Sequence, residues 1–316
     1  MTASSTRPGP TPRAPRSTEA HAPAPAPAGT APGVTSYHRL TALAPVVRVR
    51  CAPPRRGDGW IPAADLAARP EALRELIAHD ARQGLDRYGR PLRPDVAAGF
   101  GLHRVVWPVS LLFTTPWFLE RRVPLLDPAD VSVRRGTGTV ELTVRPDAFA
   151  CLPDDPAAGA PQARTVPDEN ALAAELRGAL GGFLEPLLAA FRPEVRRGPR
   201  VLWAMATDAA VEGLWHVGGL LGEEERARAE LSALLEPPPA GDRATAPECA
   251  PGAPGAPAPV PAPFTPAPFT PGAGFAAAAA GCGDASGTDR ARASCCLVYT
   301  AQPEDMCGGC PRVMRG

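Results

Sequence analysis

Apolar residues recur at helical spacing through the second half of the chain. From Asp168 onward, leucines and phenylalanines follow one another at steps of three and four residues, which places them on one face of a helix. This stripe consists of Leu172, Leu176, Leu180, Phe183, Leu184, Leu187, Leu188 and Phe191. Asp168 or Asn170 can cap the helix, and Pro186 should bend it. A further helix follows Gly198-Pro199, and a charged helix covers residues 223–235.

Two helices are also expected in the first half. Arg69-Pro70-Glu71 opens one of them, because proline is tolerated in the first turn of a helix. The other begins after Arg93-Pro94-Asp95 and continues through apolar residues to Phe113, although Pro108 must kink or split it. Its apolar character on all sides indicates that this helix is buried.

Strand patterns are fewer and come before the long helical half. Residues 37–49 lean towards β structure, with three valines near the end of the stretch. The alternating segments 131–133 and 140–144 flank a polar turn that contains two glycines, which predicts a β-hairpin. The pattern as a whole predicts an α+β fold that is mainly helical, with a small sheet or hairpin.

Proline-rich segments lie on both sides of this predicted domain in the sequence. Of the 42 prolines, eight precede Gly33 and thirteen lie between Pro237 and Pro271, so half of them fall in two segments that are poor in large apolar side chains. Such segments bury too little apolar surface to offset the conformational entropy that is lost on ordering. The predicted organisation therefore has four parts, namely a disordered N-terminal segment (1–35), an α+β domain (36–236), a low-complexity tether (237–293) and a small C-terminal module (294–316). A flexible tether of about 57 residues would reach about 40 Å, enough for the module to dock back or to move between partners.

Charge and hydropathy exclude several classes of function. The chain has 33 basic and 33 acidic residues, and every basic residue is arginine, so no general attraction to nucleic acid is expected. The longest apolar run, residues 105–119, is broken by two prolines and is shorter than the ~20 residues of a membrane-spanning helix. We therefore expect no stable membrane insertion. No apolar signal-peptide core follows the first arginines, which favours a cytoplasmic location with reduced thiols.

Four of the eight cysteines gather near the C-terminal end of the sequence. Cys295 and Cys296 are adjacent, Cys307 follows after ten residues, and Cys310 after two more. Thiolates are soft ligands, so four of them select zinc, copper or an iron-sulfur cluster. The glycines at 308–309 allow the tight turn that a Cys-x2-Cys chelate needs, whereas the adjacent pair needs an irregular backbone. No ligand role is expected for the remaining cysteines, Cys51, Cys151, Cys249 and Cys282.

Three alternatives to an iron-sulfur cluster remain open for these cysteines. A disulfide framework suits small secreted proteins, and this chain has neither property. A four-cysteine zinc site is the stronger alternative, although zinc ribbons seldom begin with two adjacent cysteines. Incidental clustering fits poorly, since four cysteines within sixteen residues is a strong bias.

The residues around the cysteines add to the pattern. Ser294 precedes the pair, Tyr299 follows it, and Pro311 closes the motif. Together with the cysteine spacing, this arrangement resembles the C-terminal signature of the FhuF-type ferric-siderophore reductases. The sequence departs from that signature at Val298, where an aromatic residue is common, and at Gly309, where an acidic residue is common. Neither residue is a ligand, so the departures concern the tuning of a cluster.

The resemblance implies a function. It implies a [2Fe-2S] cluster held by Cys295, Cys296, Cys307 and Cys310, which would be the cofactor ligands and the redox centre. The implied reaction is one-electron reduction of a ferric siderophore, releasing Fe(II) in the cytoplasm, with the domain at 36–236 as the siderophore-docking surface. The chain has no flavin or nicotinamide motif, so an external donor, a ferredoxin or a flavin reductase, is expected.

Two alternatives to this function remain. One is a non-enzymatic protein that binds zinc or an iron-sulfur cluster for structural or regulatory purposes. The other is a siderophore-binding protein without reductase activity.

Candidate residues outside the cysteine motif are less specific. Trp203, Trp215 and His216 are candidates for lining a siderophore cleft, although such positions on an apolar helix more often belong to the core. Arginines are suited to receive an anionic ferric catecholate, but the sequence singles out none of the 33. The histidines are scattered without any pair at metal-binding spacing, so surface or structural roles are expected for them. They are His21, His38, His79, His103 and His216.

Overall fold

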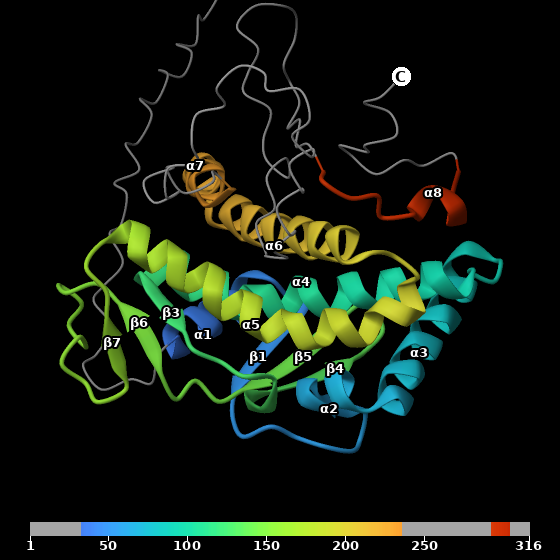
Figure 1. The fold of residues 1–316 in the computed structure, drawn as a ribbon, viewed down its shortest axis with the longest axis horizontal. Helices are drawn as coiled ribbons and strands as arrows, with labels where there is room; N and C mark the ends of the chain where they lie inside the picture. Colours follow the sequence, from blue (N-terminus) through green and yellow to red (C-terminus); the bar gives the residue numbers. More distant parts are fainter. Residues whose placement is uncertain (1–32, 236–291, 304–316) are drawn as a thin grey trace, which may run out of the picture.

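The buried helix α4 (Pro94–Glu120) is the centre of the fold. The structure is a computed structural model that describes residues 33–235 and 292–303. Helix α4 contacts α3 (Pro70–Tyr88), α5 (Glu169–Val195) and α6 (Pro199–Leu221), and Figure 1 shows α4, α5 and α6 stacked on one side of a sheet. By length and composition α4 could span a membrane, but 83% of its most apolar window is buried inside the fold. It is the core helix of a folded domain.

Helix α4 is continuous, so of the two effects predicted for Pro108, a kink or a split, the split does not occur. Both Pro108 and Pro116 lie inside the helix. Proline lacks the N–H that would bond to the carbonyl four residues earlier, so Pro116 leaves the Leu112 carbonyl without its helical partner. The hydroxyl of the fully buried Tyr37 donates a hydrogen bond of 2.8 Å to this carbonyl. A side chain from another element thus satisfies a backbone group that the proline leaves open.

The predicted helices in the second half of the chain are confirmed. Helices α5, α6 and α7 (Glu224–Leu235) follow one another, and the apolar stripe of α5 is buried. Asp168 caps α5, since its Oδ1 accepts a 2.8 Å hydrogen bond from the backbone N–H of Ala171. The spacing of apolar residues, together with a suitable capping residue, was sufficient to place this helix.

The N-terminal part of the domain differs from the prediction. Residues Val34–Leu43 form helix α1, and only Val47–Cys51 form a strand, β1, so the β structure expected over residues 37–49 is wrong for its first half. Helix α1 also begins inside the segment 1–35 that was predicted to be disordered. Tyr37 and Leu40 on α1 are fully buried, which explains why the segment is ordered as a helix. A short helix, α2 (Ala63–Ala68), was not predicted.

A four-stranded sheet packs under the helices. Its order is β1-β5-β4-β2, and it includes β2 (Trp60–Pro62), β4 (Val131–Arg135) and β5 (Val140–Val144). Strands β4 and β5 are antiparallel, with Val133 opposite Leu142, which confirms the predicted hairpin. Strand β1 pairs with β5 in parallel.

A second, three-stranded sheet lies at the other end of the domain. Its order is β3-β6-β7, formed by β3 (Arg122–Pro124), β6 (Phe149–Cys151) and β7 (Ala163–Thr165). A short 3-10 helix, Pro128–Asp130, precedes β4. The predicted α+β class, mainly helical with small sheets, is confirmed.

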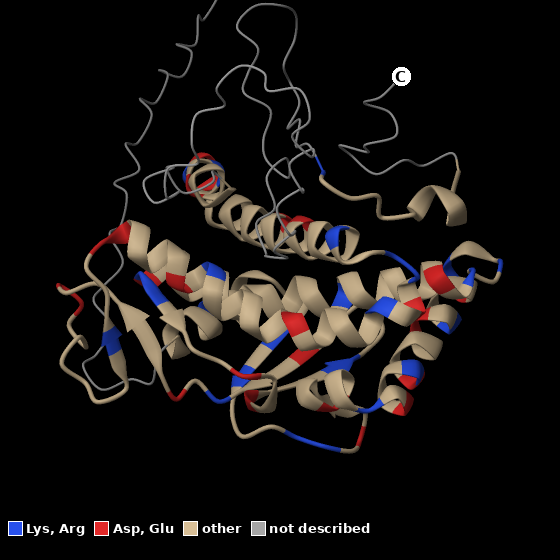
Figure 2. Ribbon diagram, in the orientation of Figure 1, with Lys and Arg blue, Asp and Glu red and all other residues tan. Residues whose placement is uncertain are grey.

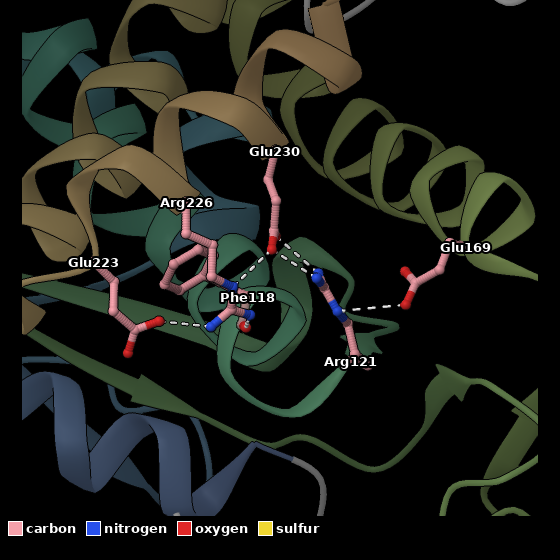
Figure 3. A network of polar contacts seen from close by, with 6 residues as sticks. All are labelled: Phe118, Arg121, Glu169, Glu223, Arg226 and Glu230. Atoms are coloured by element: carbon pink, nitrogen blue, oxygen red, sulfur yellow. Dashed lines mark hydrogen bonds and ion pairs between the residues drawn. The ribbon is translucent and has the colours of Figure 1, made fainter. Parts of the chain in front are cut away.

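A polar network joins the end of α4 to α5 and α7 (Figure 3). Arg121 donates two hydrogen bonds of 2.6 and 2.8 Å to Glu230, and its Nε lies 3.5 Å from Glu169. Arg226 donates to the carbonyl of Phe118 and lies 4.1 Å from the centre of its ring. These contacts fix α7 over the C-terminal end of the core helix.

The last described element is the short helix α8 (Val298–Ala301). Figure 1 shows it apart from the sheets, near the end of the domain where α3 leads into α4. Cys307, Cys310 and the predicted tether up to residue 291 lie outside the described residues.

Candidate functional site

The segment 292–303 lies against the helical domain rather than apart from it. Leu297 and Ala301 are buried against Val96 and Phe100 of α4, with Tyr299 packed at the edge of the same small apolar cluster. This cluster is separate from the main core. The segment that contains the first two cysteines therefore docks through its own small hydrophobic contact.

Arg90, in the turn between α3 and α4, donates hydrogen bonds to carbonyls of α8. Its Nε donates a 2.9 Å hydrogen bond to the carbonyl of Ala301, and a terminal nitrogen donates a 3.1 Å bond to the carbonyl of Thr300. Carbonyls at a helix C-terminus carry partial negative charge, so a guanidinium there is favourable. Figure 2 shows basic positions in this turn, close to α8 in the same view.

The fully buried carboxylate of Asp208 holds the residues just before the cysteine pair. Its Oδ1 accepts a 3.0 Å bond from the backbone N–H of Ala293, and its Oδ2 accepts 2.8 and 2.5 Å bonds from the N–H and hydroxyl of Ser294. Hydrogen bonds to an ionised acceptor are stronger than neutral ones. Asp208 lies on α6, so this contact sets where Cys295 and Cys296 begin relative to that helix.

Arg292 adds an ion pair at the start of the segment. It bonds to Glu212, one helical turn beyond Asp208 on α6. Nε2 of His103 lies 3.8 Å from the same carboxylate. Burial lowers the pKa of His103, and the opposing effect of Glu212 does not restore it, so the imidazole is neutral at pH 7.

The backbone at the cysteine pair is irregular, as the two adjacent ligands were expected to require. Cys295 and Cys296 are of intermediate exposure, and Leu297 directly after them has φ 61°, in the left-handed region. Cys295 packs beside the small apolar cluster, whereas Cys296 lines a pocket. The two side chains thus lie in different surroundings.

The pocket beside Cys296 has a volume of about 270 Å³ and is formed by α3, α4, α6 and the C-terminal segment. Three arginines line it, Arg87, Arg104 and Arg292, along with the rings of Tyr88 and Phe100. Sequence reasoning did not identify these residues. They are far apart in the chain and only the packing of the helices brings them together.

Two larger surface hollows are also present, and only the first of them shares residues with this pocket. One, of about 600 Å³, lies under the β4–β5 turn and shares Arg87 and Arg104 with the first. The other, of about 560 Å³, is lined by Trp107, Trp215 and His216. Trp203, by contrast, is only 5% exposed and belongs to the main core. Two of the three residues suggested for a cleft therefore line a hollow, and the third does not.

The other described cysteines lie away from this segment, on β1 (Cys51) and β6 (Cys151). Burial, and then the charge of Asp155, raises the pKa of the Cys151 thiol, which keeps it protonated and a poor metal ligand. Within residues 33–235 and 292–303, no three His, Cys, Asp or Glu side chains converge as a metal site would require. Cys249 and Cys282 lie outside the described residues.

Comparison with known families decides the nature of the C-terminal segment. Residues 292–312 match the family described as the FhuF 2Fe-2S C-terminal domain. The chain carries an FhuF-type 2Fe-2S domain. The match begins at Arg292, two residues before the predicted start of the module, and it spans all four cysteines of the motif. No curated protein and no solved structure matches the chain significantly.

The match indicates a [2Fe-2S] cluster as the cofactor of the FhuF-type domain. The described residues fit this group, because the side chains of Cys295 and Cys296 are partly exposed and iron-sulfur clusters are held by cysteine sulfur ligands. Cys307 and Cys310 fall within the match but outside the described residues. The assignment of the four cysteines as ligands therefore stays a prediction.

Proposed function

We propose that the chain is a cytoplasmic ferric-siderophore reductase. In this proposal Cys295, Cys296, Cys307 and Cys310 hold the [2Fe-2S] cluster, and a ferric siderophore binds to the helical domain beside them. The match to the FhuF-type domain supports the assignment of this cofactor. The observation that carries the proposal is the pocket, since Cys296 of that domain shares its wall with residues of α3, α4 and α6.

In this proposal a chelate bound in the pocket lies next to Cys296, one of the proposed cluster ligands. A chelate held between Phe100 and Cys296 would lie within a few ångströms of the cluster-bearing segment, and electron tunnelling falls steeply with distance. The contacts of Asp208 and Arg90 keep the segment against the same helices. The helical domain thus supplies both the binding surface and the position of the redox module.

The reaction needs one electron and no proton-transferring residue. A [2Fe-2S] cluster accepts and passes on one electron at a time. The chelated Fe(III) gains this electron and becomes Fe(II), which the hard-oxygen siderophore holds far more weakly, while the external donor loses one electron. We propose a ferredoxin or a flavin reductase as this donor.

The first test is an anaerobic visible absorption spectrum with iron and zinc analysis of the same sample, before and after dithionite. We expect charge-transfer bands that bleach, with about two irons per chain. The dithionite-reduced protein, freed of excess reductant, should then reduce ferric siderophore, with Fe(II) trapped by a coloured chelator. Zinc with a flat visible spectrum would contradict the proposal.

Matched cysteine variants sharpen this assay. Cys296→Ser removes a proposed ligand and should abolish both the visible bands and the reduction of ferric siderophore. Cys51→Ser removes a free cysteine on β1, outside the FhuF-type domain, and should change neither. A wild-type protein that has the cluster but leaves every ferric siderophore unreduced would instead favour binding without reductase activity.

A further inference from the structure

We infer that the hollow lined by Trp107 and Trp215 binds free reduced flavin as the electron donor of the cluster. The inference rests on the proposed function, since it names the donor that the redox module uses. The hollow has a volume of about 560 Å³ and is lined by residues of α4, α6 and the start of α7. Its walls, its charge and its place beside the docked segment favour a flat, uncharged, redox-active ring.

The walls of the hollow are aromatic and apolar. The ring centres of Trp107 and His216 lie 5.9 Å apart and are tilted by 51°, and both tryptophans of the hollow are partly exposed. Leu220, which also lines the hollow, is 42% exposed. Aromatic rings stack on one another in offset or tilted arrangements, and a ligand that covers these side chains removes apolar surface from water. The walls therefore favour a flat aromatic ligand.

Glu224 provides a hydrogen-bond acceptor at one side of the hollow. Its Oε1 accepts a 2.9 Å bond from Nε1 of Trp215, which fixes the two side chains relative to each other. Within the part of the chain that the structure describes, no donor bonds to Oε2, so this oxygen is available to a ligand. The ring system of a flavin has an imide N–H at one end and an apolar dimethylbenzene at the other. It therefore matches a hollow that has a carboxylate on one side and apolar walls.

The charge of the hollow disfavours strongly anionic ligands. Among the described residues that line it, none is arginine and two are glutamates. Glu212 is paired with Arg292, whereas Glu224 accepts its bond from a neutral indole and has no cation within ion-pair distance among the described residues. One carboxylate is thus left without a cationic partner, so a phosphate group or an anionic chelate would be repelled. The uncharged ring is the part of a flavin that the hollow binds, and the ribityl chain extends into water.

The hollow lies next to the pocket beside Cys296 along two helices. On α4, His103 lines that pocket, and Trp107, four residues further on, lines the hollow. On α6, Glu212 lines the hollow and pairs with Arg292, which lines the pocket. One turn of an α-helix advances about 5.4 Å. A ring in the hollow therefore lies close to the segment that carries the cysteine pair, as electron tunnelling requires.

A free flavin also meets the redox requirement. A [2Fe-2S] cluster takes up one electron at a time, whereas a nicotinamide delivers a hydride, so a carrier that releases single electrons is needed between them. Reduced flavin loses one electron to the cluster and one proton to water, and the one-electron-oxidised ring repeats this step in the next turnover. Two Fe(III) chelates are thus reduced per flavin, and a flavin reductase regenerates the reduced form. The sequence has no flavin motif, which agrees with a carrier that enters and leaves.

The first test measures binding alone. The fluorescence of oxidised riboflavin, recorded while the cluster-loaded full chain is added, reports stacking as quenching. Gly219→Leu should fill the hollow, because Gly219 lines it, is exposed, and has no atom within 4 Å of an added Cβ. This variant should weaken riboflavin binding by at least about ten-fold. The matched control is Gly178→Leu, at an equally open and exposed glycine of α5, which should have no effect.

Two further comparisons test the polar side of the hollow without adding bulk. Glu224→Gln keeps an oxygen for the bond from Trp215 but loses the charge, and it should weaken riboflavin binding by about three-fold. Riboflavin 5′-phosphate should bind no more tightly than riboflavin, because the hollow has no arginine for the phosphate.

The second test measures electron transfer. Photoreduced riboflavin is mixed with the oxidised protein under anaerobic conditions, and freeze-quenched samples are read by the electron paramagnetic resonance signal of the reduced cluster. The rate should saturate with riboflavin concentration in the wild type and in Gly178→Leu. In Gly219→Leu it should rise only linearly, through random collisions, while dithionite should reduce the cluster fully in all three proteins.

The outcomes separate this inference from the proposed function. Equal riboflavin binding in wild type and Gly219→Leu, or a rate that does not saturate in the wild type, would overturn the inference. Reduction of ferric siderophore by the dithionite-reduced protein would then leave the reductase standing with a protein as its donor. Saturable riboflavin binding and cluster reduction in a protein that reduces no ferric siderophore would support the inference and defeat the proposed reductase.

Discussion

At the scale of single residues, Asp208 is the clearest link between the helical domain and the FhuF-type domain. It is fully buried, and it accepts hydrogen bonds from three donors of Ala293 and Ser294, directly before the cysteine pair. Each hydrogen bond to a buried carboxylate contributes about 1.5–3 kcal/mol. A position held this firmly is suited to place the adjacent Cys295 and Cys296 reproducibly.

We predict that Asp208→Asn weakens the docking of residues 292–303, although asparagine has nearly the same shape as aspartate. The amide of asparagine has one accepting oxygen and one donating nitrogen, so one of the faces that now accept from N–H groups would present a donor. Proteolytic cleavage near residue 292 should become faster, and the electron paramagnetic resonance signal of the reduced cluster should broaden. Ser294→Ala, which removes only the hydroxyl bond, should have a smaller effect in both measurements. Unchanged signals in Asp208→Asn would show that this carboxylate does not position the cysteines.

Tyr37 carries a second prediction at this scale. Its hydroxyl is the partner of the Leu112 carbonyl, which Pro116 leaves open in the buried helix α4. Tyr37→Phe should therefore lower the free energy of unfolding by about 1–2 kcal/mol, the cost of an unsatisfied buried polar group. Chemical denaturation measures this change. Tyr88→Phe makes the same substitution at a half-buried site and should change the free energy far less, and an equal loss in both variants would contradict the explanation.

At the scale of elements, a buried ion pair joins β3 to the loop after β6. Arg122 donates bonds of 2.7 and 2.8 Å to Asp155, and the two side chains are 10% and 6% exposed. Burial opposes ionisation of Asp155, yet the hydrogen bonds from Arg122 and from the Ala157 amide outweigh it and hold the pKa of Asp155 below its ordinary value. The pair therefore stabilises the fold while Asp155 is charged.

Asp155→Asn should cost about 2 kcal/mol of unfolding free energy at pH 7. Because the pKa is lower in the folded state, this contribution is complete above the unfolded pKa of about 3.9 and is lost as the pH falls through the folded value. Urea unfolding of wild type and variant should therefore converge in acid. The control is Asp147→Asn, whose aspartate is 73% exposed and pairs with Arg145, and which should change stability by less than about 0.5 kcal/mol. A difference that does not shrink at all between pH 7 and pH 3 would contradict the ion-pair explanation.

The sequence predicted elements wherever the local signal and the tertiary environment agree. The stripe of α5 and its Asp168 cap, and the alternation in β4 and β5, are such cases. The prediction for residues 37–49 failed because the valines of β1 extended a β signal over α1, whose helix depends on burial of Tyr37. Pro108 does not split α4, which was one of its two predicted effects, because packing around the helix keeps it continuous through the proline.

The candidate site divides in the same way. The cysteine motif is local, so its spacing and ligand softness predicted a site for a soft metal or an iron-sulfur cluster, and the resemblance to the FhuF-type signature implied a [2Fe-2S] cluster. The pocket is not local, because Arg87, Arg104 and Cys296 meet only through the packing of α3, α4 and the C-terminal segment. Asp208 gave no signal either, since an acid within an apolar helix does not reveal which backbone it will face.

At the scale of the whole molecule, the FhuF-type domain and the helical domain have separate hydrophobic contacts. Among the described residues, the main core is formed by those before 236, and of residues 292–303 only Ala293 packs at its edge. The docked segment has its own small cluster around Phe100 and Leu297. The stability of the helical domain should therefore depend little on the cluster. Docking of the C-terminal segment, in contrast, should depend on the cluster and on the folded helical domain.

This separation gives the last prediction. Cys307→Ser should abolish the visible absorption of the cluster, because loss of one thiolate exposes an iron to water and oxidation. The far-ultraviolet circular dichroism and the thermal midpoint of the helical domain should change by no more than the docked segment contributes, about 2 °C for a domain of this size. A chain ended at residue 291 is the matched control, since it lacks the docked segment altogether and should unfold at nearly the same temperature. If the helices melt in Cys307→Ser while the shortened chain stays folded, the unliganded module itself disrupts the domain, and if both melt, the cluster is part of the core.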